Sequence, residues 1–293
     1  MEANEILQKL EKIISQNGPA MEDFGEFTIT VNSIAELIQK NIVTHREMTS
    51  LKEKCHFLKD TNSIMGHILS KPFGYAGDFH IIDRIYTQDI SEKFPKWDRF
   101  SLSNSAAQAV RNRKEYFKEK VAQNLSGGGD LLNIACGPAR DLYEFHSENS
   151  ISNFQTICVE MDERAIVYAK QLNQKFLDKI SFVNKNIFQF QTNQKFDLIW
   201  SAGLFDYFDE QAFVLLLKRF KNWLKEDGEI IIGNFNENHN PSRAYMELFG
   251  EWYLNHRSEE QLYHLAEEAG FQKAKVRVGR EPENVNLFLH LKE

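Results

Sequence analysis

Cysteine is scarce in this sequence. Only three cysteines, Cys55, Cys136 and Cys158, occur among 293 residues, and none forms a CxxC pair or lies beside a Cys/His cluster. An odd number of thiols without such spacing argues against a disulfide framework and against a zinc site. We therefore expect buried thiols in a reducing compartment and no bound metal.

Long hydrophobic runs are also lacking. No stretch approaches the roughly 18 apolar residues of a membrane-spanning helix. Residues 1–14 lack the basic and apolar regions of a signal peptide. These two absences predict a cytoplasmic protein without stable membrane insertion.

Positive charge is in deficit. The chain has 35 Lys and Arg residues against 42 Asp and Glu residues, a formal net charge of −7, and no local basic run. Such a chain has no broad attraction to phosphate backbones, so we expect no nucleic-acid partner and favour a small molecule. The hydrophobic content of 42% is enough to fill a large core.

Residues 4–124 have the periodicity of helices, because apolar side chains recur three and four positions apart. The pattern breaks at residues 71–79, KPFGYAGDF, where proline, glycine and aromatic residues gather. Loops of this composition often contact ligands, and Tyr75 and Asp78 carry polar groups suited to that role. A plain turn between two helices is the alternative.

Three consecutive glycines, Gly127 to Gly129, predict a boundary between a helical region over residues 1–126 and a second domain over residues 127–293. Beyond it, apolar runs typical of strands alternate with helical patterns, which predicts an α/β fold with a doubly wound, mostly parallel sheet. The strand candidates are residues 131–135, 156–160, 180–184, 196–202 and 229–235, and the helices begin near residues 139, 163, 209 and 258.

The chain ends in two more strand candidates, residues 274–280 and 285–291. The link between them is too short for a crossover, so we expect the two strands to form an antiparallel hairpin.

The segment LLNIACGPARDL, residues 131–142, reads as a buried strand, a turn and the start of a helix. A ligand can approach the backbone closely where no side chain intervenes, and the helix start offers free N–H groups. Gly137 is therefore the expected contact point.

The next strand ends at Glu160, 23 residues after Gly137. This is close to the roughly 20-residue spacing at which an acid meets the ribose hydroxyls of a nucleotide cofactor. Asp162 is the competing acid. A strand-end carboxylate that is simply solvated is the alternative for Glu160.

The segment FDLIWSAGLFDYFDE, residues 196–210, combines a strand, a turn of small residues and a loop rich in aromatic and acidic side chains. Asp206 and Tyr207 are candidates to orient or deprotonate an acceptor, with helix capping or rim packing as the equally weighted alternative. One or two of the aromatic residues could line an apolar pocket.

These segments together resemble the Rossmann-like, or class I, methyltransferases that use S-adenosylmethionine. The resemblance covers residues 131–293 and departs from the family at several positions, because asparagine and alanine replace an acid and two glycines in the first loop. It implies the following cofactor-binding residues: Asn133, Ala135, Gly137, Glu160, Met161, Asn186, Ile187 and Ser201, with Tyr75 and Asp78 added by the glycine-rich loop.

A narrower resemblance extends over KPFGYAGDF with the following IIDRIY, over GLFDYF, over residues 240–262 and over the terminal NVNLFLHL. These segments are similar to a bacterial group of methyltransferases for 3-hydroxypalmitic acid methyl ester. The group implies a fatty-acid carboxylate as acceptor, which needs a positioning cation rather than a base. Arg257, Arg111 and Arg113 are the candidates, although each alone is more typical of a surface salt bridge.

The predicted function is thus methyl transfer to a small-molecule acceptor. The helical region, together with residues 240–257, is expected to form a lid over the acceptor site, and a homodimer is left open. A nicotinamide-dependent oxidoreductase is one alternative, disfavoured because residues 138–140 replace the glycines that a pyrophosphate needs. A non-catalytic S-adenosylmethionine-binding protein is the other.

Overall fold

The computed structural model describes residues 3–149 and 153–293, which form two compact units. The helical unit comprises residues 1–108 and 240–253, and the sheet unit comprises residues 109–239 and 254–293. The boundary therefore lies between Gln108 and Ala109, ahead of the predicted break at Gly127. Each unit is described by itself below.

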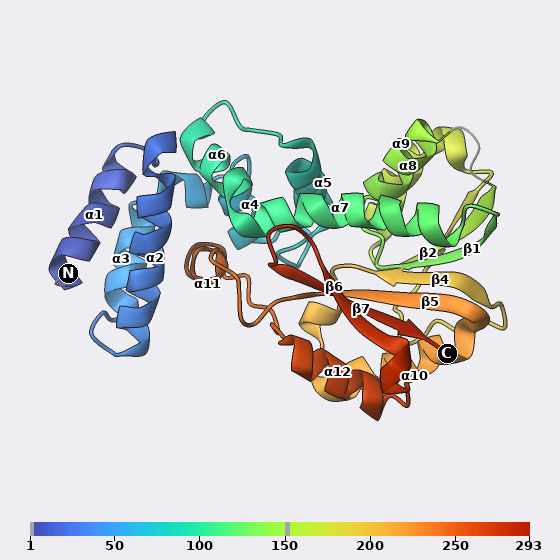
Figure 1. Cartoon of the computed structure of the whole chain (residues 1–293). Coiled ribbons are helices and arrows are strands. Elements are labelled where there is room, and N and C mark those ends of the chain that lie inside the picture. Colours follow the sequence, from blue (N-terminus) through green and yellow to red (C-terminus); the bar gives the residue numbers. More distant parts are fainter. Residues whose placement is uncertain (1–2, 150–152) are drawn as a thin grey trace. The chain divides into compact units, whose positions relative to one another are not determined.

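The sheet unit contains a seven-stranded sheet of order β3-β2-β1-β4-β5-β7-β6 (Figure 1). All pairs from β3 to β5 are parallel, whereas β7 pairs antiparallel with both β5 and β6. The predicted parallel sheet with a terminal antiparallel hairpin is thus confirmed. The strands are β1 (Gly129–Ile134), β2 (Phe154–Glu160), β3 (Ile180–Asn184), β4 (Phe196–Ser201), β5 (Leu224–Phe235), β6 (Val276–Arg280) and β7 (Asn286–Lys292).

Helices cover both faces of this sheet, which explains why its central strands are almost continuously apolar. Two hydrophobic clusters, one per face, hold these layers together. The helices of the first face are α7 (Ser105–Asn124), α8 (Arg140–Glu148) and α9 (Glu163–Leu172), and those of the second are α10 (Glu210–Trp223) and α12 (Glu259–Glu268).

Helix α7 belongs to the sheet unit from Ala109 onward. The Tyr116 ring stacks on Phe288 of β7 at 3.9 Å, and Phe117 meets Trp200 of β4 edge to face at 5.2 Å. The predicted boundary differs from the observed one because the glycines end α7 without ending its packing. Helical periodicity alone does not reveal which layer a helix packs against.

The helical unit has its own aromatic core. Phe27 and Trp97 are both buried with their ring centroids 5.7 Å apart, and Phe57 stacks on Trp97 at 4.0 Å. The segment from Asn240 to Tyr253 belongs to this unit, whereas Leu254 to Arg257 belongs to the sheet unit. The helices are α1 (Ala3–Ser15), α2 (Phe24–Gln39), α3 (His45–Glu53), α4 (Ile64–Ser70), α5 (Phe79–Thr87), α6 (Pro95–Ser103) and α11 (Arg243–Gly250).

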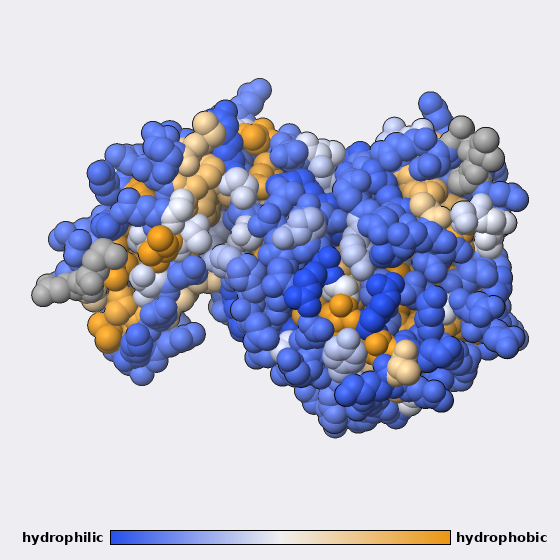
Figure 2. Space-filling view, viewed as in Figure 1, coloured by the Kyte–Doolittle hydropathy of each residue, from blue (hydrophilic) through white to orange (hydrophobic). Residues whose placement is uncertain are grey.

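The surface is mainly hydrophilic on the face seen in Figure 2, with smaller apolar areas. Across residues 3–149 and 153–293, no helix has both the length and the apolar character needed to cross a membrane. All three cysteines are buried and unpaired, as expected from their number and spacing.

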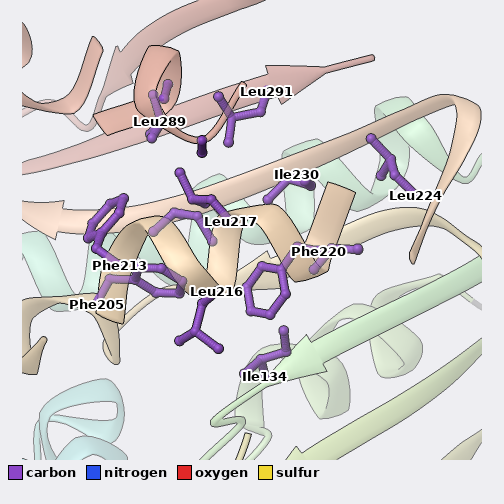
Figure 3. Packing of buried hydrophobic residues seen from close by; sticks show 14 of the residues in the cluster. Ile134, Phe205, Phe213, Leu216, Leu217, Phe220, Leu224, Ile230, Leu289 and Leu291 are labelled. Carbon is purple, nitrogen blue, oxygen red and sulfur yellow. The ribbon is translucent and has the colours of Figure 1, made fainter. Parts of the chain in front are cut away.

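Figure 3 shows how α10 fills the second face of the sheet with Phe213, Leu217 and Phe220. The Phe220 ring is fully buried and lies 5.9 Å from the Phe205 ring, measured between centroids. We expect Phe220→Ala to lower the free energy of unfolding by about 3–5 kcal/mol, because it leaves a cavity in a packed core. Leu215→Ala, on the exposed side of the same helix, should change it by less than about 0.5 kcal/mol.

Urea denaturation followed by circular dichroism measures both variants. Equal, small effects of the two substitutions would contradict the described orientation of α10.

Candidate functional site

The candidate residues of the sheet unit gather at the carboxyl ends of β1, β2 and β4. The chain runs from β1 outward to β2 and β3 and then returns to β4 on the other side of β1, so the strand order reverses at β1. In open α/β sheets this reversal of strand order opens a crevice that binds ligands. The predicted residues Asn133, Glu160 and Ser201 lie at or near these three strand ends.

The turn from β1 to α8 has an unusual backbone. Ala135, Gly137 and Ala139 have φ values of 54°, 53° and 49°, all in the left-handed region. The two alanines thus adopt the conformation that glycines would favour, at a cost of roughly 1–2 kcal/mol each. A Cβ atom built on Gly137 would meet nothing within 4 Å, so this turn is open where a ligand would approach.

Glu160, at the end of β2, joins this turn to the next one. Its Oε2 atom accepts a hydrogen bond from the Gly137 amide at 3.1 Å, and its Oε1 atom accepts from the amides of Met161 and Asp162 at 2.8 and 3.0 Å. Burial raises the pKa of this carboxyl, while the three amides act to lower it. Glu160 therefore supports two turns, a structural role beyond the predicted ribose contact.

The neighbouring acid, Asp162, makes different contacts. Its side chain caps α9 by accepting from the Arg164 amide, and it forms a salt bridge with the Arg164 guanidinium at 2.8 Å. Met161 is 64% exposed beside these acids and is available to cover a ligand. A ribose contact by Glu160 stays a prediction, with Asp162 as the competing acid.

The candidates after β3 divide into one exposed and one buried residue. The Asn186 Oδ1 atom accepts a hydrogen bond from the Phe188 amide at 2.9 Å, which shapes the turn. The Ile187 side chain is packed in the core of the second face, so mainly its backbone remains for a ligand. The sequence pair Asn186-Ile187 does not by itself show which of the two side chains is exposed and which is buried.

Two buried polar atoms at the crevice lack partners. Asn133 near the end of β1 and Ser201 at the end of β4 are on adjacent strands, and each is at most 2% exposed. Among the residues that the structure describes, neither the Asn133 Nδ2 atom nor the Ser201 Oγ atom has a hydrogen-bond partner. Buried polar groups are normally paired, so these two atoms are candidates to receive hydrogen bonds from, or donate them to, a bound ligand.

Asp206, predicted to act on the acceptor, is almost fully buried in the loop after β4. Its Oδ1 atom accepts from the Phe235 amide at 2.7 Å, and its carbonyl oxygen accepts from the Asn255 amide. Burial raises the pKa of this carboxyl to about 6, although the Phe235 amide and nearby arginines oppose the shift. The adjacent Tyr207 is 42% exposed.

Arg257, the third catalytic candidate, is buried and donates hydrogen bonds to neighbouring segments of the sheet unit. Its guanidinium donates to the carbonyl oxygens of Phe205 and Phe208 and to Asn234 Oδ1, at 3.1, 2.5 and 2.7 Å. The same group lies 4.7 Å from the centre of the Phe213 ring. The sequence-based assignment to an acceptor differs from this geometry, because main-chain carbonyls use the donors that an acceptor would need.

Tyr75 and Asp78 lie in the helical unit. Both oxygens of Asp78 are used there: Oδ1 caps α5 by accepting from the amides of His80 and Ile81, and Oδ2 is 2.8 Å from His67 Nε2. The side chain is fully buried. Tyr75 is half-buried. A cofactor contact by these two residues stays a prediction.

Comparison with known proteins identifies the sheet unit. Residues 125–270 match the family model described as a methyltransferase domain. The chain is an S-adenosylmethionine-dependent methyltransferase of the Rossmann-like class. This match favours methyl transfer over the oxidoreductase alternative. No curated protein sequence matches the chain.

Solved structures similar to this methyltransferase share its fold at low sequence identity. A possible exported protein from Bordetella parapertussis is 16% identical, with a TM-score of 0.66 over 100% of this chain and 97% of its own. Magnesium protoporphyrin IX methyltransferase from Synechocystis PCC 6803, with bound S-adenosylhomocysteine, is 12% identical, with a TM-score of 0.53 over 78% of this chain and 98% of its own.

Two further residues of this region, Asp141 and Gly203, are not among the predicted site residues. Asp141 is buried in the first turn of α8, and burial raises its pKa to about 6. Gly203 follows β4 and packs against the Arg113 guanidinium. Only the fold brings these groups together, because α7, α8 and the β4 loop are distant in the sequence.

The left-handed alanines of the first turn generate a prediction. Ala135→Gly should raise the free energy of unfolding by about 0.5–1 kcal/mol, because glycine adopts positive φ without steric cost but loses more entropy on folding. Ala169→Gly, inside helix α9, should lower it by about 1 kcal/mol. Thermal and urea unfolding of both variants would test this, and destabilisation by Ala135→Gly would contradict the described turn.

Proposed function

We propose that the crevice at the ends of β1, β2 and β4 is the cofactor site of this methyltransferase. Its residues suit the chemistry of S-adenosylmethionine. Glu160 accepts hydrogen bonds from a ribose, Met161 covers the adenine, and Gly137 allows close approach of the backbone. The observation that carries the proposal is the pair of unpartnered polar atoms on Asn133 and Ser201, beside an open turn.

The acceptor we propose is a small molecule that presents a carboxylate on an apolar body, such as a fatty acid. When bound, the cofactor supplies a methyl group activated by its positive sulfonium. A carboxylate oxygen is already a competent nucleophile, so the protein has to bind, orient and exclude water rather than remove a proton. This agrees with Asp206, whose carboxyl is buried and engaged by the Phe235 amide.

We also propose a small-molecule partner, because the net charge of −7 gives no broad attraction to phosphate backbones, and a cytoplasmic location, because three buried free thiols suit a reducing compartment. Because Arg257 donates to main-chain carbonyls, we propose Arg111 of α7 as the cation that positions the acceptor carboxylate.

The cofactor site is tested by Glu160→Gln. We expect about a tenfold or larger loss of affinity for S-adenosylhomocysteine, because an amide accepts weaker hydrogen bonds than a carboxylate and cannot accept through its nitrogen. Asp162→Asn is the matched control: its side chain still caps α9, so affinity should remain near that of the wild type. Isothermal titration calorimetry measures both.

Circular dichroism must show that both variants are folded, since Glu160 also supports two turns. A larger loss in the Asp162 variant than in the Glu160 variant would instead assign the ribose to Asp162.

The acceptor is tested with radiolabelled S-adenosylmethionine and matched lipids. We expect label in the methyl ester of a long-chain 3-hydroxy fatty acid and none in the corresponding primary amide, whose nitrogen and oxygen are poor nucleophiles. Transfer to amines or phenols, with none to carboxylic acids, would overturn the proposed acceptor while leaving the methyltransferase assignment intact.

A further inference from the structure

Arg113 is a buried cation without a direct partner. Its side chain is on α7 within the sheet unit, and the residue is only 7% exposed. Within the described part of the chain, Arg113 forms no salt bridge, and its Nε atom has no hydrogen-bond partner. Burying a charged guanidinium in this way is costly unless an anion completes its environment.

The position of this guanidinium is defined by its neighbours. A Cβ atom built on Gly203, just after β4, would lie 3.1 Å from Arg113 Nη1 and 3.4 Å from Nη2. Glycine at this position therefore makes room for the guanidinium at the carboxyl edge of the sheet. Ser201, with its unpartnered hydroxyl, lies two residues earlier.

Two buried acids are within electrostatic reach of Arg113 but do not pair with it directly. Its charge acts to lower the pKa of Asp141 and of Asp206, although burial of each carboxyl has the larger, opposite effect. Asp141 instead accepts from the Leu142 amide, and Asp206 accepts from the Phe235 amide. The guanidinium donors thus remain available to a planar anion that enters the crevice.

We propose that Arg113 binds a carboxylate at the ends of β1 and β4, and that the methionine carboxylate of the cofactor is its source. The second part rests on the proposed cofactor site. With the ribose held by Glu160 on β2 and the adenine beside Met161, the opposite end of the cofactor extends from Gly137 toward β4. Asn133, Ser201 and Arg113 are the polar groups on that side.

The chemistry of the methionine end fits this set. A guanidinium presents donors in a planar fork that matches the two oxygens of a carboxylate. The Asn133 side chain and the Ser201 hydroxyl are close to the same strand ends and can bind the ammonium or an oxygen. The acceptor's own carboxylate has the same chemistry, so the experiment must separate the two sources.

The experiment compares ligands that differ by this group. S-adenosylmethionine, decarboxylated S-adenosylmethionine and 5′-methylthioadenosine are titrated calorimetrically into the wild type and Arg113→Met. In the wild type, loss of the carboxylate alone should weaken binding by about tenfold or more. In Arg113→Met, the ratio of the dissociation constants of decarboxylated and intact S-adenosylmethionine should fall close to one. The affinity for 5′-methylthioadenosine should equal that of the wild type.

Arg280→Met is the matched control, because Arg280 lies on β6 and pairs with the exposed Glu259. This variant should keep the wild-type ratio. If Arg113→Met fails to fold, Arg113→Lys retains the charge without the fork and should give an intermediate ratio. The comparison of the first two ligands in the wild type then still tests whether the carboxylate is recognised.

Three results would overturn the proposal. An unchanged ratio in folded Arg113→Met means that the residue does not bind the cofactor's carboxylate. An equal loss for all three ligands means that Arg113 only supports the fold. A rise in KM for the fatty-acid acceptor with unchanged cofactor affinity assigns Arg113 to the acceptor's carboxylate instead. Failure of the wild type to bind any of the ligands would overturn the proposed cofactor site itself.

Discussion

The hydrogen bond from the Gly137 amide to the Glu160 carboxylate is the interaction on which the site depends. It connects the turn after β1 with the end of β2, two segments separated by helix α8. The same carboxylate holds the amides of Met161 and Asp162, so one side chain shapes the entrance to α9 as well. Because these bonds form within the protein itself, we expect the turn to keep its form before a ligand arrives, so that binding requires little further ordering.

The turn after β1 keeps a left-handed backbone although alanines replace two of the glycines that are common in the family. Ala135 and Ala139 take the left-handed conformation although their side chains disfavour it. The surrounding structure compensates for that strain: the Ala135 amide donates to the Val159 carbonyl, and Ala139 is fully buried under α8. Only Gly137, where the ligand side is open, needs to lack a side chain.

Two buried arginines differ in their hydrogen-bond partners, and this difference suggests a structural role for one and a ligand-binding role for the other. Arg257 donates to main-chain carbonyls of the β4 loop and lies over the Phe213 ring, which compensates for its burial. Arg113 is similarly buried but packs against the bare backbone of Gly203. Among the described residues Arg113 has no comparable set of acceptors, and for this reason we assign its missing anion to a ligand.

The sequence by itself determined the order of strands and helices and the terminal hairpin, because periodicity and turn composition are local properties. Tertiary structure alone decided that α7 packs on the sheet, that residues 240–253 belong to the helical unit, and which buried charges are paired. Asp78 and Arg257 were candidates for ligand contacts in the sequence, yet Asp78 pairs with His67 of α4, and Arg257 donates to the main chain after β4. Burial and pairing depend on segments that meet only after folding, and local sequence patterns do not contain that information.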